Sequence, residues 1–221
     1  MYKLAIFDFD GTLVDSAPGI VDVMFQVAEY YDFPGSVVEH WKQLIGVPLN
    51  DQTEIILPGT GRIFQEEVAD KYREFYNSRC IELCPPFPSL FHLLETLRNA
   101  NITITIASSK KKTIIDPVLE HHNIQGYFSL VIGAEGVKHH KPHPEAVLNT
   151  LKHHKCSRDD AVVIGDSNFD LEMARNAGVD AIGVSTGVHG PEILRQATPI
   201  SVVGSLTDAL ELILNGRNKV A

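Results

Sequence analysis

The chain has 221 residues, 44% of them hydrophobic and 21% charged, which suffices for one large core and a smaller appended unit. Its formal net charge of −9 argues against nucleic acid or an anionic membrane as a general partner, because phosphate groups attract basic surfaces. No stretch approaches the roughly 20 apolar residues of a membrane span, and residues 1–20 do not fit a signal peptide. The three cysteines form no CxxC pair. We therefore expect a soluble, cytoplasmic protein.

The first predicted element is a short strand over residues 4–8, and it ends in two acids, Asp8 and Asp10. Residues two apart in an extended segment project to the same side, so the two carboxylates can converge. Gly11 follows at once and lets the backbone turn tightly and approach a ligand. Because unpaired buried charge is costly, an apolar strand that ends in two acids needs a counterion or a chemical task.

The next 70 residues or so predict helices only, interrupted by glycine and proline. A proline-rich stretch, residues 84–88, then reads as a stiff return connection, because proline fixes φ and deters helix formation. We predict a smaller, all-helical domain over residues 16–85, inserted after the first strand. Its expected helices cover residues 19–31, 37–45, 49–56 and 63–79.

The rest of the chain alternates short apolar runs with amphipathic stretches of helical length. Strands that alternate with helices predict a parallel sheet covered on both faces, hence an α/β core built from residues 1–15 and 86–221. The further strands are expected over residues 102–109, 130–135, 161–166 and 180–185. The helices are expected over residues 88–99, 112–122, 144–153, 169–177 and 206–214.

Polar side chains follow several of these strands. Ser108, Ser109 and Lys110 come after the second strand, and Lys141 follows the third by a short connection. Asp166 and Asp170 lie in the sequence GDSNFD after the fourth. In parallel α/β sheets ligands bind beyond the carboxyl ends of the strands, so these groups should meet Asp8 and Asp10 there. Carboxylates suit Mg²⁺, and a hydroxyl, backbone amides and an ammonium suit a phosphate group.

The ordered set DFDGT, ASS, KPHPE and GDSNFD resembles the four motifs of the haloacid dehalogenase superfamily. The opening DGTLVDS, the early helical insertion and the sequence KPHPE resemble its phosphoglycolate-phosphatase-like branch. The resemblance covers essentially the whole chain. It implies a Rossmannoid parallel-sheet core, a helical cap domain placed after the first motif, and Mg²⁺ as cofactor.

The resemblance also implies a role for each motif residue. Asp8 would be the nucleophile that becomes an aspartyl phosphate, and Asp10 would be the general acid and base. Mg²⁺ would be held by Asp8, by Asp166 and by the backbone carbonyl of Asp10. The phosphoryl oxygens would be bound by Ser108, Ser109, Gly11 and Lys141, and the supporting residues would be Asp170 and Thr12.

The helical cap would exclude water from the site and contribute substrate contacts, with hinges near residues 16–17 and 85–86. Glycine and proline interrupt two predicted helices at residues 44–48, so this stretch is the candidate for a loop that faces the site. Under this hypothesis, replacing Gly46 changes the ranking of substrates more than the affinity for metal.

Simpler structural roles compete with these functional ones. Asp8 and Asp10 could form an ordinary Asp-Gly turn, and the serines could merely cap the following helix. Asp166 could be an acid in a turn or at a helix N-cap. Lys141 could be a solvated lysine in a loop, and Asp170 could be an exposed acid on a helix. For residues 110–112, three lysines, a solvated helix start is the favoured interpretation. The histidines of residues 139–143 are not read as a metal site, because Mg²⁺ prefers oxygen ligands.

The predicted function is Mg²⁺-dependent hydrolysis of a small phosphomonoester through an aspartyl-phosphate intermediate. Phosphoglycolate is the first expected substrate, on the resemblance alone. The rivals within the superfamily are a phosphosugar mutase and a pyrophosphatase. A receiver-like, phospho-accepting signalling domain is a rival from another class. The partner is expected to be a small phosphorylated metabolite, with no nucleic acid and no membrane, and the protein a monomer or a homodimer.

Overall fold

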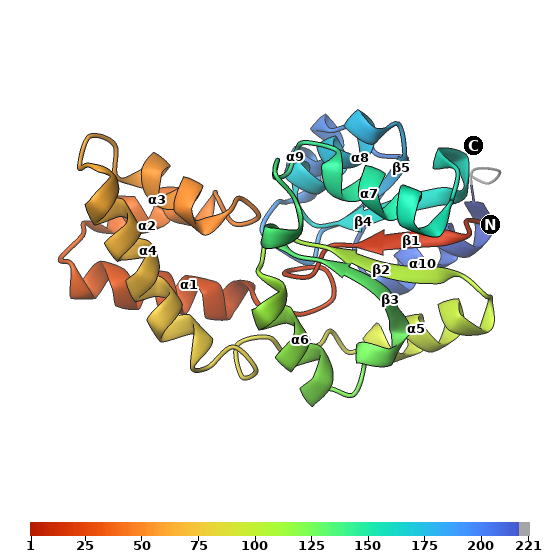
Figure 1. The fold of residues 1–221 in the computed structure, drawn as a ribbon, viewed down its shortest axis with the longest axis horizontal. Coiled ribbons are helices and arrows are strands. Elements are labelled where there is room, and N and C mark those ends of the chain that lie inside the picture. The colour runs from red at the N-terminus through yellow and green to blue at the C-terminus, as the bar shows by residue number, and fades with distance from the viewer. Residues whose placement is uncertain (217–221) are drawn as a thin grey trace.

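The computed structural model describes residues 1–216 and contains a six-stranded sheet in which every neighbouring pair of strands is parallel. The strand order is β3-β2-β1-β4-β5-β6, so the first strand lies at the centre of the sheet (Figure 1). The predicted α/β class is therefore confirmed. The strands are β1 (Leu4–Phe7), β2 (Thr103–Ala107), β3 (Phe128–Ile132), β4 (Ala161–Gly165), β5 (Asp180–Val184) and β6 (Ser201–Val203).

Helices cover both faces of the sheet (Figure 1). One face packs against α5 (Leu90–Asn99), α6 (Lys112–His121) and α10 (Leu206–Asn215). The other packs against α7 (Glu145–His154), α8 (Asn168–Ala177) and α9 (Pro191–Gln196). Short 3-10 turns occur at Gln125–Tyr127, Ala134–Gly136 and Arg158–Asp160. Among residues 1–216, none of the helices combines the length and the apolar character needed to cross a membrane.

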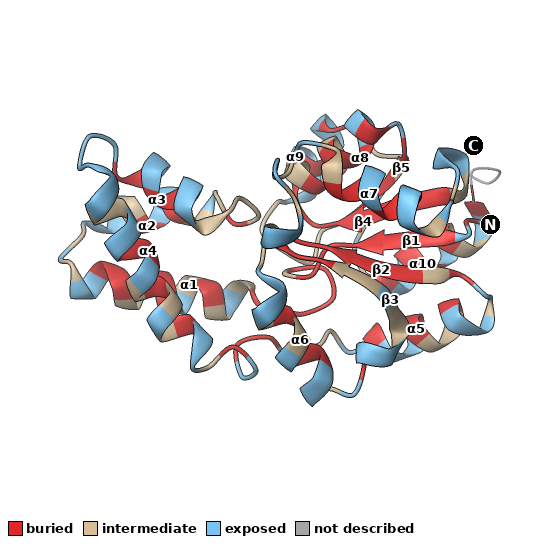
Figure 2. Cartoon of the chain, viewed as in Figure 1, coloured by how far each residue is buried: buried red, intermediate tan, exposed pale blue. Residues whose placement is uncertain are grey.

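The two central strands read as continuous apolar runs because both of their faces are covered. Every residue of β1 and of β4 is buried, and Figure 2 shows these strands red along their length. Alternate residues serve the two faces: Ala5 and Phe7 belong to the core that contains α5 and α10, whereas Leu4 and Ile6 belong to the core that contains α7 and α8. This two-sided burial fixes the register of β1, and with it the position of the acids that follow.

Four helices between β1 and α5 form a separate helical lobe that lies beyond one edge of the sheet (Figure 1). Two connections join this lobe to the sheet, and they run side by side. Asp15 N donates to Pro85 O at 2.8 Å, and Phe87 N donates to Leu13 O at 3.2 Å. The division into two domains at these connections stays a prediction. The helices of the lobe are α1 (Ala17–Tyr30), α2 (Gly35–Lys42), α3 (Leu49–Ile56) and α4 (Arg62–Asn77).

Several element boundaries differ from the prediction. The third strand runs over Phe128–Ile132 and ends before Gly133, where the chain turns to bond with the loop after β2: Ala134 N donates to Lys110 O at 3.0 Å. Helix α1 begins at Ala17, since proline is tolerated in the first turn. The predicted elements did not include α9 and β6, because six- and three-residue elements are too short to show periodicity.

Candidate active site

Groups that follow three neighbouring strands meet at the sheet edge that faces the helical lobe. Asp8 follows β1, Ser108 follows β2 and Asp166 follows β4, and all three are at least nine-tenths buried. They line one cavity of about 590 Å³ between the sheet and the lobe. These three side chains therefore meet at the carboxyl ends of the strands, as predicted.

Three buried carboxylates cluster at this site. One oxygen from each of Asp8, Asp166 and Asp170 lies within 4.8 Å of the others. The ammonium of Lys141 lies between two of them, with Nζ at 2.6 Å from Asp8 Oδ1 and at 2.5 Å from Asp170 Oδ1. Only 5% of the Lys141 side chain is exposed, so it is not a solvated loop lysine.

Asp166 is held by contacts from two loops. Thr12 Oγ1 donates to its Oδ1 at 2.9 Å, and the backbone amide of Val188 donates to its Oδ2 at 3.2 Å. Two glycines make room for it: a Cβ on Gly11 or on Gly187 would collide with the carboxylate. Gly11 also has a φ of +71°, which favours glycine. Sequence analysis missed Gly187 and Val188, although the sequence STG after the fifth strand marks a tight turn.

Asp170 has a structural role as well as a place in the carboxylate cluster. It is the third residue of α8, where its Oδ2 accepts hydrogen bonds from the backbone amide of Ser167 at 3.1 Å and from the Ser167 hydroxyl at 2.6 Å. This capping box leaves Oδ1 for Lys141. With only 1% of its surface exposed, Asp170 is not the solvated helix acid considered as an alternative.

The buried cluster has more carboxylates than ammonium groups. Burial raises the pKa of Asp8 to about 7, against the opposing effect of the Lys141 ammonium. Burial, together with the charges of Asp170 and Asp8, holds the pKa of Asp166 well above its usual range. Burial lowers the pKa of Lys141, but the carboxylates of Asp170 and Asp8 outweigh this effect and raise that pKa above its ordinary value. One ammonium thus faces three buried carboxylates, whose oxygens are the donors that hard divalent cations take, so the cluster fits a metal ion.

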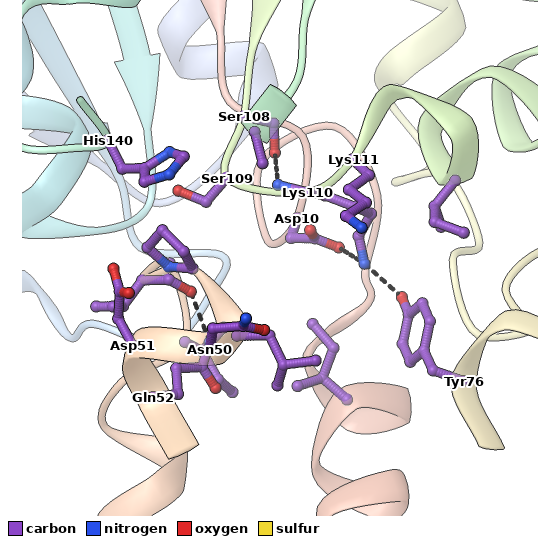
Figure 3. A pocket seen from close by; sticks show the side chains of 18 of the residues that line it. Asp10, Asn50, Asp51, Gln52, Tyr76, Ser108, Ser109, Lys110, Lys111 and His140 are labelled. Atoms are coloured by element: carbon purple, nitrogen blue, oxygen red, sulfur yellow. Dashed lines mark hydrogen bonds and ion pairs between the residues drawn. The ribbon is translucent and has the colours of Figure 1, made fainter. Parts of the chain in front are cut away.

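Asp10 lies in the same cavity but outside the carboxylate cluster. Its Oδ1 accepts a hydrogen bond from Ser16 Oγ at 2.6 Å and lies 3.0 Å from Nζ of Lys110 (Figure 3). The side chain of Asp10 therefore does not belong to the group of carboxylates that could hold a metal ion. That its backbone carbonyl is a metal ligand stays a prediction. Sequence analysis was wrong about Lys110: its side chain is 12% exposed and is not part of a solvated helix start.

The two serines after β2 do not cap α6. That helix begins at Lys112, whose amide donates to the Glu135 carboxylate at 3.0 Å, while Ser108 Oγ accepts from the amide of Lys110 at 3.2 Å. The Oγ of Ser109 is buried and makes no hydrogen bond within residues 1–216. Both serines line the cavity. Their predicted role in binding phosphate stays a prediction.

The helical lobe supplies the opposite wall of the cavity. Residues 45–48 line it, as the glycine and proline punctuation predicted. Gly46 has a φ of +104°, and a Cβ there would lie 3.3 Å from the Ser167 hydroxyl and from the ring of Phe169. Helix α4 contributes Arg73 and Tyr76, which no sequence motif indicated.

Comparisons with known proteins agree with this architecture. The family described as Haloacid dehalogenase-like hydrolase matches residues 5–184. The protein named Probable phosphatase IndB, from Dickeya dadantii, is 30% identical over 95% of this chain and 93% of its own. Phosphoglycolate phosphatase of Vibrio cholerae is 28% identical over 96% of this chain and 97% of its own. A solved structure from Bacteroides fragilis, described as a haloacid dehalogenase-like hydrolase, is 29% identical with a TM-score of 0.88, covering 95% of this chain and 100% of that one. The chain therefore belongs to the haloacid dehalogenase-like hydrolase family, as its four motifs predicted.

Proposed function

We propose that this hydrolase is a phosphatase that removes the phosphoryl group of a small phosphomonoester with the help of Mg²⁺. The observation that carries the proposal is the contact between Asp8, which lines the cavity, and Lys141, 2.6 Å away, beside two further buried carboxylates. An acid with a cation at its side and an open cavity above it suits nucleophilic attack on an anionic group.

The metal would be held by Asp8, Asp166 and the backbone carbonyl of Asp10, with Asp170 as a supporting acid. When bound, Mg²⁺ supplies positive charge that offsets the repulsion between these carboxylates and a phosphoryl group. The protein residues then divide the remaining work. Lys141 would stabilise negative charge on the transferring group, and Ser108 with the nearby amides would bind its oxygens.

The chemistry proceeds in two steps on Asp8. A carboxylate oxygen of Asp8 attacks phosphorus, the bond from phosphorus to the substrate oxygen breaks, and Asp10 gives its proton to the leaving oxygen. A water molecule then attacks phosphorus of the aspartyl phosphate and Asp10 takes a proton from that water. The bond from phosphorus to the Asp8 oxygen breaks, which restores the carboxylate and releases inorganic phosphate. The helical lobe, which we propose to be a cap domain over residues 16–85, would exclude bulk water during the first step.

Phosphoglycolate is the first substrate to test, because the Vibrio cholerae relative carries that activity in its name. The cavity of about 590 Å³ also leaves room for larger phosphomonoesters. The test is a phosphate-release screen over phosphoglycolate, sugar phosphates, nucleotides and pyrophosphate, with Mg²⁺ and with EDTA, beside an Asp8→Asn control. We expect Mg²⁺-dependent release of phosphate from at least one monoester by the wild type only.

Other outcomes with the same substrates would overturn the proposal. Release from pyrophosphate alone would make the protein a pyrophosphatase. Turnover of a sugar phosphate only with a bisphosphate activator, without net release, would make it a mutase. A single phosphorylation event without turnover would indicate a receiver-like domain.

A further inference from the structure

Lys110 connects the sheet to the helical lobe at the active site (Figure 3). It lies in the loop after β2, and its Nζ is 3.0 Å from Asp10 Oδ1. The same ammonium donates to the hydroxyl of Tyr76, on α4, at 2.8 Å and lies 4.1 Å from the centre of that ring. A single side chain thus contacts the proposed general acid on one side and the helical lobe on the other.

These contacts are largely shielded from water, so they constrain the groups they join. The side chains of Lys110 and Asp10 are 12% and 16% exposed, and Tyr76 is 3% exposed. A surface ion pair contributes little, because water competes for both charges. A desolvated ammonium instead requires its partners to stay in place, since the loss of either one leaves a buried charge without compensation.

The way in which Asp10 is held matters for proton transfer. Ser16 and Lys110 both contact Oδ1, and within residues 1–216 no hydrogen bond or ion pair reaches Oδ2. Since Asp10 lines the cavity, Oδ2 is the oxygen available to a leaving group. The protein therefore holds one oxygen of Asp10, and the other has no protein partner within residues 1–216.

The second contact of Lys110 ties this arrangement to the helical lobe. Tyr76 lies near the C-terminal end of α4, and its hydroxyl is 3.0 Å from Sγ of Cys84, at the second connection. Ser16, the other partner of Asp10, lies at the first connection. The first connection therefore contacts the carboxyl group of Asp10 directly, and the second is linked to it through Tyr76 and Lys110.

We propose that Lys110 is a positioning residue that orients Asp10 for proton transfer to the leaving oxygen, and that Tyr76 makes this orientation depend on the position of the helical lobe. The inference rests on the proposed phosphatase function. Lys110 itself neither gains nor loses a proton. The proton passes from Asp10 to the leaving oxygen as the bond to phosphorus breaks, and it is returned by the attacking water.

The test compares two substrates that differ chiefly in their need for a general acid. p-Nitrophenoxide leaves without a proton, whereas the more basic phenoxide benefits from one. We expect Lys110→Met to lower kcat for phenyl phosphate about 10-fold more than kcat for p-nitrophenyl phosphate, since general acids contribute about 10²–10⁴-fold. KM for both substrates should change less than about 3-fold, because a positioning role acts on the chemical step.

Two further variants accompany Lys110→Met. Tyr76→Phe keeps the ring but removes the hydroxyl, so it should shift the same ratio in the same direction by about 3-fold. This variant decides the matter if Lys110→Met does not fold, as judged by its thermal unfolding midpoint. Lys112→Met is the matched control: it removes a lysine two positions away whose side chain pairs with Asp116 at the surface, and it should leave the ratio unchanged.

The outcomes separate the two proposals. If the wild type releases phosphate from neither substrate with Mg²⁺, the proposed function fails, and this inference fails with it. If the wild type is active and Lys110→Met lowers kcat equally for both substrates, or raises KM alone, only the positioning role is overturned. The positioning role is likewise overturned if Tyr76→Phe leaves the ratio at its wild-type value.

Discussion

At the scale of single residues, the site is built around an imbalance of charge. Asp8, Asp166 and Asp170 are buried together, and Lys141 is the one ammonium within contact distance of the cluster among residues 1–216. Buried carboxylates repel one another, and the raised pKa of Asp8 and that of Asp166 reflect this burial. Such an arrangement costs stability unless a bound cation offsets it. The proposed metal ion would supply that offset.

The first prediction concerns the nucleophile. Asp8→Asn keeps the size of the side chain but removes the attacking oxygen anion, so kcat should fall at least about 10³-fold. Because the amide carries no charge, the thermal unfolding midpoint in EDTA should be no lower than that of the wild type. Steady-state phosphate release and differential scanning fluorimetry measure the two effects. Retention of more than a tenth of the wild-type kcat would rule out Asp8 as the nucleophile.

The second prediction concerns the metal. A cation that binds only the native state at about 100 times its Kd stabilises by about 2.7 kcal/mol, which raises the midpoint of a chain of this size by about 5–10 °C. We expect such a Mg²⁺-dependent rise for the wild type and less than half of it for Asp166→Asn. A Mg²⁺ titration followed by differential scanning fluorimetry provides the measurement.

An exposed acid serves as the control for this titration. Glu192→Gln removes a carboxylate from α9 that pairs with Arg195 at the surface, so its response to Mg²⁺ should equal that of the wild type. An unchanged response of Asp166→Asn would show that the ion binds elsewhere.

At the scale of elements, strand ends supply the reactive groups and a loop of the helical lobe supplies the facing wall. Residues 45–48 lie between α2 and α3 and reach the α8 N-terminus, where Gly46 approaches Ser167 and Phe169. At Gly46, where the loop meets the start of α8, the backbone adopts a conformation that residues with a side chain disfavour. The position of the loop of residues 45–48, rather than the carboxylate cluster, should therefore determine which leaving groups fit into the cavity.

The third prediction follows from this contact. In Gly46→Ala the added Cβ meets both a strained φ and close neighbours, so the loop should shift away from α8. We expect kcat/KM to change by about 10-fold for some phosphomonoesters relative to others, which corresponds to about 1.4 kcal/mol. The midpoint of the Mg²⁺ titration should change less than about 2-fold, because no metal ligand lies in the loop. A substrate panel and the Mg²⁺ titration are the two measurements.

A second glycine of the lobe controls for backbone strain. Gly59 has a φ of +79°, but a Cβ there would meet no atom within 4 Å. Gly59→Ala should therefore destabilise the protein without changing the ranking of substrates. If Gly46→Ala also leaves that ranking unchanged, the loop does not select the substrate.

At the scale of the whole molecule, much of the architecture was readable from the sequence. Apolar runs buried on both faces indicated β1 and β4, and their acidic ends indicated the edge where the site lies. The helical insertion was readable because 3.6-residue periodicity replaces strand signals between Ser16 and Pro85. Motif order then identified the family.

The features that escaped prediction depend on contacts between distant segments. Nothing local distinguishes Lys110 from Lys112, yet the first lies between Asp10 and Tyr76, largely shielded from water, and the second lies at the surface. The same holds for the amide of Val188, which reaches Asp166 across 22 positions of sequence. Burial and partner choice arise from tertiary packing, which periodicity and propensity do not encode.

The most direct test of the account is a crystal structure of the protein with Mg²⁺ and beryllium trifluoride, a mimic of the phosphoryl group. We predict that beryllium bonds to a carboxylate oxygen of Asp8 and that one Mg²⁺, about 2.1 Å from its ligands, contacts Asp8 and Asp166 together. Beryllium trifluoride bound away from Asp8, or a Mg²⁺ that touches neither carboxylate, would contradict the account.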